Sequence, residues 1–121
     1  MRLRALRGAT TVEENSAGAI VAATEELVRE VMERNSLAVE DMVSCLFTCT
    51  GDLDAEFPAL AARNLGLSAV PLLCAREIDV PGALPLTIRL MLHCYAEESA
   101  PARHVYLRDA VSLRRDLEGA Q

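Results

Sequence analysis

One long helical pattern near the N-terminus constrains the fold more than any other feature of the sequence. Between residues 20 and 33, apolar side chains recur every three or four positions, which is the spacing of one helix face. These residues are Ile20, Ala23, Leu27, Val28, Val31 and Met32. The other face is mostly charged, and Asn15 or Ser16 can cap the first turn. A helix with a single apolar face needs a surface to pack on, and the rest of the chain offers a sheet.

The remaining segments have the composition of short strands. We predict strands at residues 3–6, 42–48, 69–74, 88–95 and 104–107. The second has apolar residues at both alternating positions, so we expect it to be central and covered on both faces. The first is expected to end in a turn at Gly8.

A second, short helix is expected over residues 54–64, with Pro58 in its first turns and its end near Gly66. The tail, residues 113–121, is polar with little to pack against, and we expect it to be mobile. The sequence therefore predicts an α+β fold that spans residues 1–121 as a single domain. Its expected architecture is a mixed sheet of about five strands with one long amphipathic helix on one face.

The core must be built from light side chains. Aromatic residues make up only 3% of the 121 residues and Trp is absent, so Leu, Val, Ile, Ala and Met have to fill it. A domain of this size with such side chains is helped by burying further surface in an oligomer. Composition alone does not give the number of subunits.

The charge balance excludes several classes of function. The net charge is −6, which disfavours nucleic acid and anionic membranes as partners, because both require a basic surface. All twelve basic residues are Arg, so a Schiff-base lysine and a phosphate-loop lysine are both excluded. Any cationic site must use guanidinium groups, which suit planar carboxylates.

The cysteines show no metal-ligand spacing, and no metal or cofactor is expected. They are Cys45, Cys49, Cys74 and Cys94. Cys45 and Cys49 would lie about 13 Å apart on one strand, too far to form a disulfide. The N-terminal residues lack the apolar stretch of a signal peptide, and no segment is long and apolar enough to span a membrane. We expect a reduced, cytoplasmic protein.

The common catalytic patterns are missing from the sequence. Neither His93 nor His104 belongs to a recognisable arrangement of nucleophile, base and acid, and no glycine-rich phosphate loop is present. A single histidine on a strand is more often structural than catalytic. The chemistry must therefore depend on other residues.

Arg89 is the first residue that points to a site, because it lies inside an otherwise apolar strand. A buried guanidinium is costly unless it is paired, so an internal salt bridge or an edge position remains an alternative to a ligand site. Arg7 raises a similar question, since alternation places it on the same face as Leu3 and Ala5. Glu77 follows the third strand closely, where either a site residue or a solvated loop carboxylate is expected.

Four segments together resemble the monofunctional trimeric chorismate mutases of the AroH class. They are RGATTVEEN, DLDAEFPALAARNLG, VPLLCAREIDVPGALPLTIRLM and RHVYLRDAVSLRRDL. The resemblance runs in register from about residue 2 to residue 117. The segments are specific for this family only when they occur together, since any one of them alone would not be. The all-helical chorismate mutases do not resemble this sequence.

The resemblance implies a homotrimer that rearranges chorismate to prephenate in phenylalanine and tyrosine biosynthesis. The three sheets would pack inward as a pseudo-barrel, the helices would lie outside, and each active site would lie between two subunits. Catalytic roles are implied for Arg89, Glu77 and Arg7. Substrate-binding roles are implied for Tyr106, Cys74, Phe57, Arg63, Leu73 and Arg114. Cys74 and Tyr106 would line the pocket from the same subunit as Arg89, Phe57 and Arg63 would approach from the neighbouring subunit, and Arg114 would close the mouth.

Two positions depart from the family pattern, and two other functions compete with it. The family often has Lys where this chain has Leu60, and Pro where it has Arg115. The runner-up is a trimeric imine or enamine deaminase, which has a similar architecture but characteristic motifs that are absent here. A third reading is a non-catalytic binder of small carboxylates. It is disfavoured because such a binder has no need of the Arg89 cation at the ether oxygen.

Overall fold

A mixed five-stranded sheet forms the centre of the structure, a computed structural model that describes residues 1–114. The strands are β1 (Arg2–Thr11), β2 (Met42–Cys49), β3 (Leu72–Arg76), β4 (Thr87–Ala96) and β5 (Val105–Tyr106), in the spatial order β3-β2-β4-β1-β5. β4 runs antiparallel to both β1 and β2. The two edge strands, β3 and β5, run parallel to β2 and β1 respectively. The predicted mixed sheet is thus confirmed.

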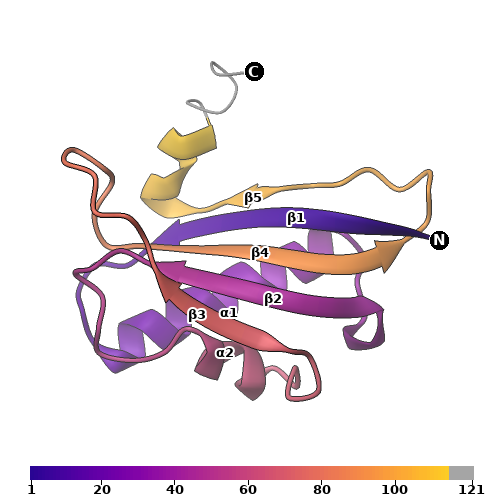
Figure 1. Ribbon diagram of the computed structural model, residues 1–121, viewed down its shortest axis with the longest axis horizontal. Coiled ribbons are helices and arrows are strands. Elements are labelled where there is room, and N and C mark those ends of the chain that lie inside the picture. The colour runs from indigo at the N-terminus through magenta and orange to yellow at the C-terminus, as the bar shows by residue number, and fades with distance from the viewer. Residues whose placement is uncertain (115–121) are drawn as a thin grey trace.

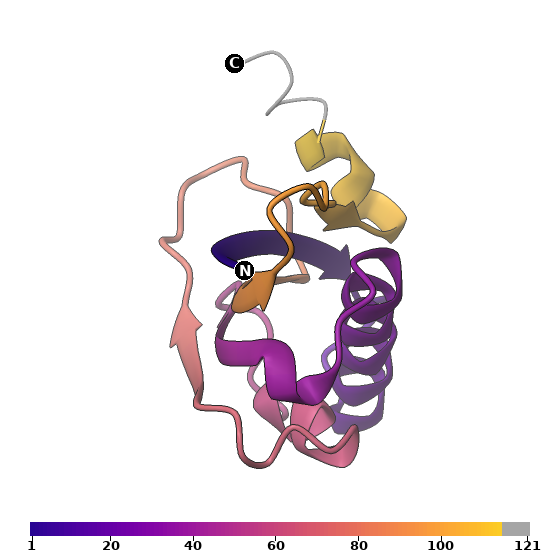
Figure 2. The same cartoon turned by 90° about the vertical axis from the view of Figure 1, so that its right-hand side faces the viewer.

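The α-helices lie together on one face of this sheet (Figures 1 and 2). They are α1 (Ala17–Arg34) and the short α2 (Ala59–Asn64), with 3₁₀ turns η1 (Val39–Asp41) and η2 (Arg108–Ala110) at the sheet's ends. Helix α1 begins where the sequence predicts, because Ser16 Oγ accepts the Ala19 N–H at 3.2 Å. In the part of the chain that the structure describes, no α-helix covers the other face. We call this the open face.

The core lies between the sheet and the helices. Helix α1 contributes five of the six apolar residues of the predicted stripe to this core. The five buried residues are Ile20, Ala23, Leu27, Val28 and Val31. Phe47, at the centre of β2, is the largest fully buried side chain among the described residues. The core is otherwise aliphatic, as the low aromatic content requires.

β2 is central, but the chain itself covers only one of its faces. Val43 and Leu46 are exposed on the open face, and so are Leu3 of β1, Leu73 of β3 and Tyr95 of β4. The expectation that β2 is covered on both faces is therefore wrong for the chain alone. An exposed apolar surface of this kind is typical of an interface.

Three predicted boundaries differ from the structure. β1 continues through Gly8 to Thr11, where the sequence suggested a turn at Gly8. α2 begins at Ala59, with Pro58 just before its first residue, so residues 54–58 are not helical. β3 is displaced toward the C-terminus and ends at Arg76, because it pairs in register with β2 as far as Cys49.

Gly8 is required by close packing between the sheet and α1. A Cβ at this position would lie 3.1 Å from Leu90 Cγ and 3.2 Å from Leu27 Cδ1, closer than side chains normally approach. We expect Gly8→Ala to lower the free energy of unfolding by about 1–3 kcal/mol, the usual cost of overpacking. Chemical denaturation at one fixed protein concentration measures it.

Gly18, in the first turn of α1, is the matched control for Gly8. A Cβ there meets nothing within 4 Å, so Gly18→Ala should leave stability unchanged or raise it by up to about 1 kcal/mol. Equal stability of the two alanine variants would contradict the packing explanation for Gly8.

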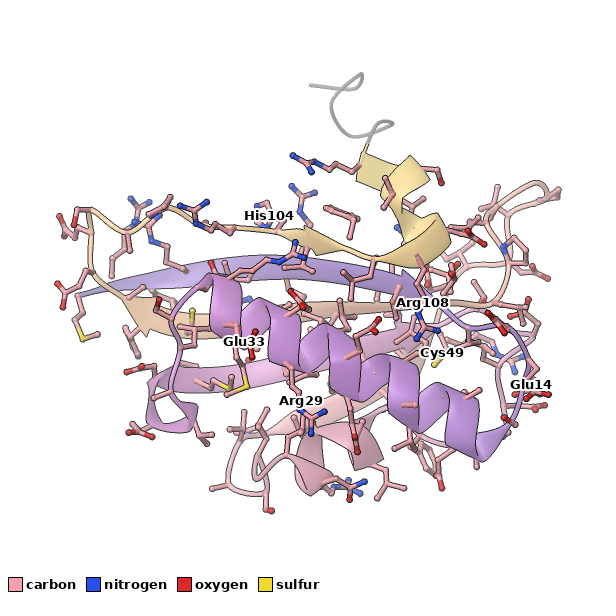
Figure 3. The ribbon with its side chains drawn as sticks, turned by 180° about the vertical axis from the view of Figure 1, so that it is seen from behind. Glu14, Arg29, Glu33, Cys49, His104 and Arg108 are labelled. Atoms are coloured by element: carbon pink, nitrogen blue, oxygen red, sulfur yellow. The ribbon has the colours of Figure 1, made fainter. Side chains whose placement is uncertain are left out.

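The segment after β5 is tied back to the rest of the fold. Arg108 reaches from η2 toward α1 (Figure 3), where its Nε lies 3.4 Å from Glu26 Oε1. The Asp109 N–H donates to Thr11 Oγ1 at 3.3 Å. These contacts hold the short β5, and with it Tyr106, against β1.

Candidate active site

Three of the predicted site residues line one hollow on the open face. This hollow has a volume of about 280 Å³, and Arg7, Arg89 and Tyr106 lie in its wall together with Leu46 and Met91. The strands bring them together although they are far apart in sequence. Two cations and one phenol thus meet over a largely apolar floor.

Strand register explains the position of each of these side chains. In the ladder, Arg89 of β4 lies opposite Ala9 of β1 and opposite Thr48 of β2. Tyr106 of β5 lies opposite Ala9 on the other side. The small Ala9 therefore separates the arginine from the tyrosine across three adjacent strands and leaves space between them. Successive side chains alternate between faces, so Arg7 and Ala9 share the open face.

Arg89 forms an ion pair with Glu77. Its Nε lies 2.9 Å from Glu77 Oε1, but the two groups are not aligned for a hydrogen bond. Arg89 Nε and Glu77 Oε2 are both buried atoms, and neither has a hydrogen-bond partner among the described residues. Buried polar atoms without partners are uncommon. The salt-bridge interpretation of Arg89 is therefore correct, and because its side chain is 43% exposed, the other N–H groups of the guanidinium can still bind a ligand.

Glu77 is held in place by its own backbone. Its N–H donates to the Cys49 carbonyl at 2.9 Å, which extends the pairing of β2 with β3 by one residue. The side chain also lines a neighbouring hollow of about 410 Å³, formed with the loop of residues 78–85. Glu77 thus joins the end of β3 to the cation of β4 and is not a solvated loop carboxylate.

The other predicted residues do not line the hollow around Arg89. Phe57 and Cys74 line a separate hollow of about 360 Å³ near α2. The chain therefore groups Cys74 with Phe57, whereas the resemblance placed it beside Arg89. Leu73 is exposed on the open face and Arg63 is exposed on α2. Arg114 is the last described residue and is also exposed.

Sequence reasoning missed two residues near these hollows. Arg76 lines both the hollow of Phe57 and that of Glu77, and His104 accepts the Arg7 N–H through Nδ1 at 3.0 Å. Both lie within one or two positions of a predicted residue, Glu77 or Tyr106. For Arg76, the position next to Glu77 was a signal that sequence reasoning could have used. For His104 no such signal was present in the sequence, because its partner Arg7 is 97 positions away.

The buried thiols are poor nucleophiles. Burial, more than the nearby Cys74, raises the pKa of Cys45 to about 12. Burial likewise raises the pKa of Cys49 to about 11. Thiolates are the reactive form, so neither side chain is suited to covalent catalysis near neutral pH.

Residues 1–114 hold neither a metal-ligand cluster nor a membrane-spanning helix. This part of the chain contains no group of three or more His, Cys, Asp or Glu side chains that could hold a metal ion. None of its helices is long and apolar enough to cross a membrane.

Fold and site together define a small α+β protein whose arginines converge on an open sheet face, an arrangement that suits a small carboxylate ligand. The family model described as "Chorismate mutase type I" matches residues 3–117. The chain belongs to this family of chorismate mutases.

Individual relatives agree with this assignment. The chain is 48% identical to the Chorismate mutase AroH of Thermus thermophilus over 121 residues, covering 98% of this chain and 99% of the relative. It is 42% identical to Chorismate mutase AroH of Bacillus subtilis strain 168, covering 97% and 94%. A solved chorismate mutase from Clostridium thermocellum matches with a TM-score of 0.87 at 48% identity, covering 90% of this chain and 98% of that one. The predicted family is confirmed, and the deaminase alternative is not favoured.

Proposed function

We propose that this chain converts chorismate to prephenate by binding the compact conformer of chorismate and stabilising the charge that develops on its ether oxygen. The observation that carries the proposal is the convergence of Arg7, Arg89 and Tyr106 on one hollow, with Arg89 Nε turned to Glu77 and the Arg89 side chain still 43% exposed. Membership of the chorismate mutase family supports the same substrate.

The reaction explains why the common catalytic patterns are missing. Chorismate is a dianion, and its ether C–O bond breaks while a C–C bond forms in the same concerted step. This step needs no nucleophile and no proton transfer. An enzyme accelerates it by orientation and by preorganised donors at the atom that gains charge.

Arg89 is the proposed donor to the ether oxygen. The Glu77 carboxylate, 2.9 Å from its Nε, holds the guanidinium in one orientation before the substrate arrives. A donor fixed in this way loses little energy to reorganisation in the transition state. Glu77 also has an oxygen without a hydrogen-bond partner in the described residues, and we assign it to the ring hydroxyl of the substrate.

Arg7 and Tyr106 are the proposed binding groups for the enolpyruvyl carboxylate. They line the same hollow as Arg89, from β1 and β5 respectively. A guanidinium and a phenol can each donate to a carboxylate oxygen. Because this carboxylate is present in both the substrate and the transition state, these contacts should mainly lower KM.

The remaining site residues are proposed to complete the site of a neighbouring subunit in a homotrimer. Phe57, Cys74 and Arg63 lie outside the hollow of Arg89 in the single chain, so a partner is needed to bring them to the substrate. The exposed apolar residues of the open face, including Leu46 and Leu73, support association through the sheets. We propose the pseudo-barrel arrangement on this basis, with Leu73 at the subunit boundary.

Arg114 and the tail are proposed to act at the mouth of the site. Arg114 is described, but residues 115–121 lie outside the described part of the structure, and with them most of the tail predicted to be mobile.

Residues 1–121 are proposed to form one domain of a cytoplasmic enzyme. The net charge of −6 supports the absence of nucleic-acid and membrane partners.

Turnover of chorismate by the purified protein tests the proposal. We expect loss of chorismate absorbance, with prephenate identified by its acid conversion to phenylpyruvate. Light scattering should give three times the mass of a 13.1 kDa chain. A folded trimer that binds chorismate without turnover would favour the non-catalytic binder and overturn the proposed activity.

Subunit mixing tests the shared site separately. Arg89→Ala and Arg63→Ala remove residues that belong, by the proposal, to opposite sides of one interface. Mixed trimers of the two variants should contain some sites free of both changes and recover part of the wild-type activity. Two inactive parents that stay inactive after exchange, shown to have occurred by mass spectrometry, would contradict an intersubunit site.

A further inference from the structure

His104 lies on the segment that runs beside β1 into β5 (Figure 3). β1 pairs with β4 along its whole length, but its ladder with β5 contains only Gly8 and Ala9. The N–H of Arg7 comes just before this ladder. Here a side chain takes the place of the strand partner, because His104 Nδ1 accepts that N–H at 3.0 Å.

The neighbours of His104 are fixed as well. The Asn35 side chain, at the C-terminal cap of α1, donates to the Arg103 carbonyl and accepts the Arg103 N–H, both at 2.9 Å. After β5, the Leu107 N–H donates to the Ala9 carbonyl at 2.9 Å. The segment is therefore held in place before and after Tyr106. The side chain of His104 adds a hydrogen bond to the backbone of Arg7.

We infer that His104 is a positioning residue, whose neutral ring holds the backbone of Arg7 and the register of β5 and thereby places the Arg7 and Tyr106 side chains for the substrate carboxylate. The inference rests on the proposed function, which gives Arg7 and Tyr106 that role. His104 itself is assigned no contact with substrate.

The hydrogen bond requires a particular protonation state of the ring. Nδ1 can accept only when the imidazole is neutral with its proton on Nε2, because both nitrogens of an imidazolium are donors. His104 is exposed overall, but partial burial of its ring first, and then the nearby Arg7 guanidinium, lower the pKa of His104 from its ordinary 6.5. Among the described residues, the Arg7 guanidinium is the charged group that shifts the pKa of His104. Arg103 is the residue before His104 in the sequence, and Asn35, which binds the backbone of Arg103, is uncharged. The contact is therefore kept at neutral pH and lost as pH falls through the lowered pKa.

Two substitutions of His104 separate its hydrogen bond from its bulk. His104→Ala removes the acceptor, and we expect KM for chorismate to rise about tenfold at pH 7.5 with kcat within about twofold, since one hydrogen bond is worth roughly that factor. His104→Asn keeps an acceptor oxygen that never protonates, and its KM should stay within about twofold of wild type. The matched control is His93→Asn, because His93 is the other histidine and contacts Ser44 on the open face instead.

The pH dependence gives a readout that a purely structural role would not move. As pH falls through the lowered pKa of His104, KM of wild type and of His93→Asn should rise, while KM of His104→Asn should stay flat. In NMR spectra of the wild-type protein, the Arg7 amide signal should titrate with the same pKa as the His104 ring. An alanine variant with wild-type KM, an identical pH profile for His104→Asn and wild type, or an Arg7 amide that does not follow the ring would overturn the inference.

Failure of this inference can be told from failure of the proposed function. If wild type does not turn over chorismate, the function is wrong, and the NMR titration still tests the contact between His104 and Arg7. If wild type turns over and loses activity through Arg89→Ala, but His104→Ala keeps the wild-type KM, only the positioning role is wrong. The NMR experiment needs no variant, so it also stands if His104→Ala does not fold.

Discussion

Replacing Arg89 by alanine is expected to lower kcat for chorismate by roughly 10²–10³, the usual loss when one preorganised donor to a developing charge is removed. In the proposed mechanism Arg89 interacts with the ether oxygen mainly in the transition state, so the loss should appear in kcat more than in KM. Steady-state kinetics on the purified variant measure it. Circular dichroism and light scattering confirm that the variant keeps the fold and mass of wild type.

Arg89→Lys is the informative companion to this variant. Lysine keeps the charge but loses the forked geometry that matches both Glu77 and the substrate. We expect a smaller loss than for alanine, yet still well below wild type. A kcat of Arg89→Ala within tenfold of wild type would contradict the assignment of Arg89 to the ether oxygen.

Replacing Phe47 by alanine is expected to lower the free energy of unfolding by about 3–5 kcal/mol. Phe47 is 0% exposed, lies at the centre of β2 and packs in the main core cluster, so its removal leaves a cavity that neighbours fill only in part. This is a large fraction of the total stability of a domain, about 5–15 kcal/mol. Denaturant unfolding at one protein concentration measures it, because oligomers unfold in a concentration-dependent way.

Phe57, the other phenylalanine, serves as its control. Phe57 is 68% exposed in the chain, so Phe57→Ala should cost much less, below about 1 kcal/mol. A loss for Phe57→Ala as large as that for Phe47→Ala would contradict the explanation of the Phe47 loss by burial in the core of the chain.

Periodicity was sufficient to predict the helix but not the sheet. The apolar stripe of α1 and a cap at Asn15 or Ser16 both follow from local sequence, and the structure has Ser16 as the cap and five of the six stripe residues buried. β1 was predicted too short because Gly8 suggests a turn, whereas it is required by Leu27 and Leu90 from elements far away in sequence. Alternation shows which residues share a face of a strand, but it does not say which strands are neighbours. The order β3-β2-β4-β1-β5 is therefore visible only in the structure.

Part of the candidate site could be predicted from physical reasoning alone. Arg89 attracts attention because a cation inside an apolar strand needs a partner, and the structure supplies Glu77. The identity of that partner depends on Glu77, just after β3, reaching past the end of β2 to β4, which no local pattern specifies. The contact of His104 with Arg7 is harder still, because 97 positions separate the two residues. The remaining assignments, including Phe57 and Arg63, came from the family resemblance, and they stay predictions.

A single-turnover experiment tests most directly whether a fixed cation drives the reaction. With enzyme in excess over chorismate, the observed rate isolates the chemical step from substrate binding and product release. The proposed mechanism predicts fast conversion to prephenate by wild type and a chemical step at least about a hundredfold slower for Arg89→Ala. Equal single-turnover rates for the two proteins, both folded and saturated with substrate, would contradict it.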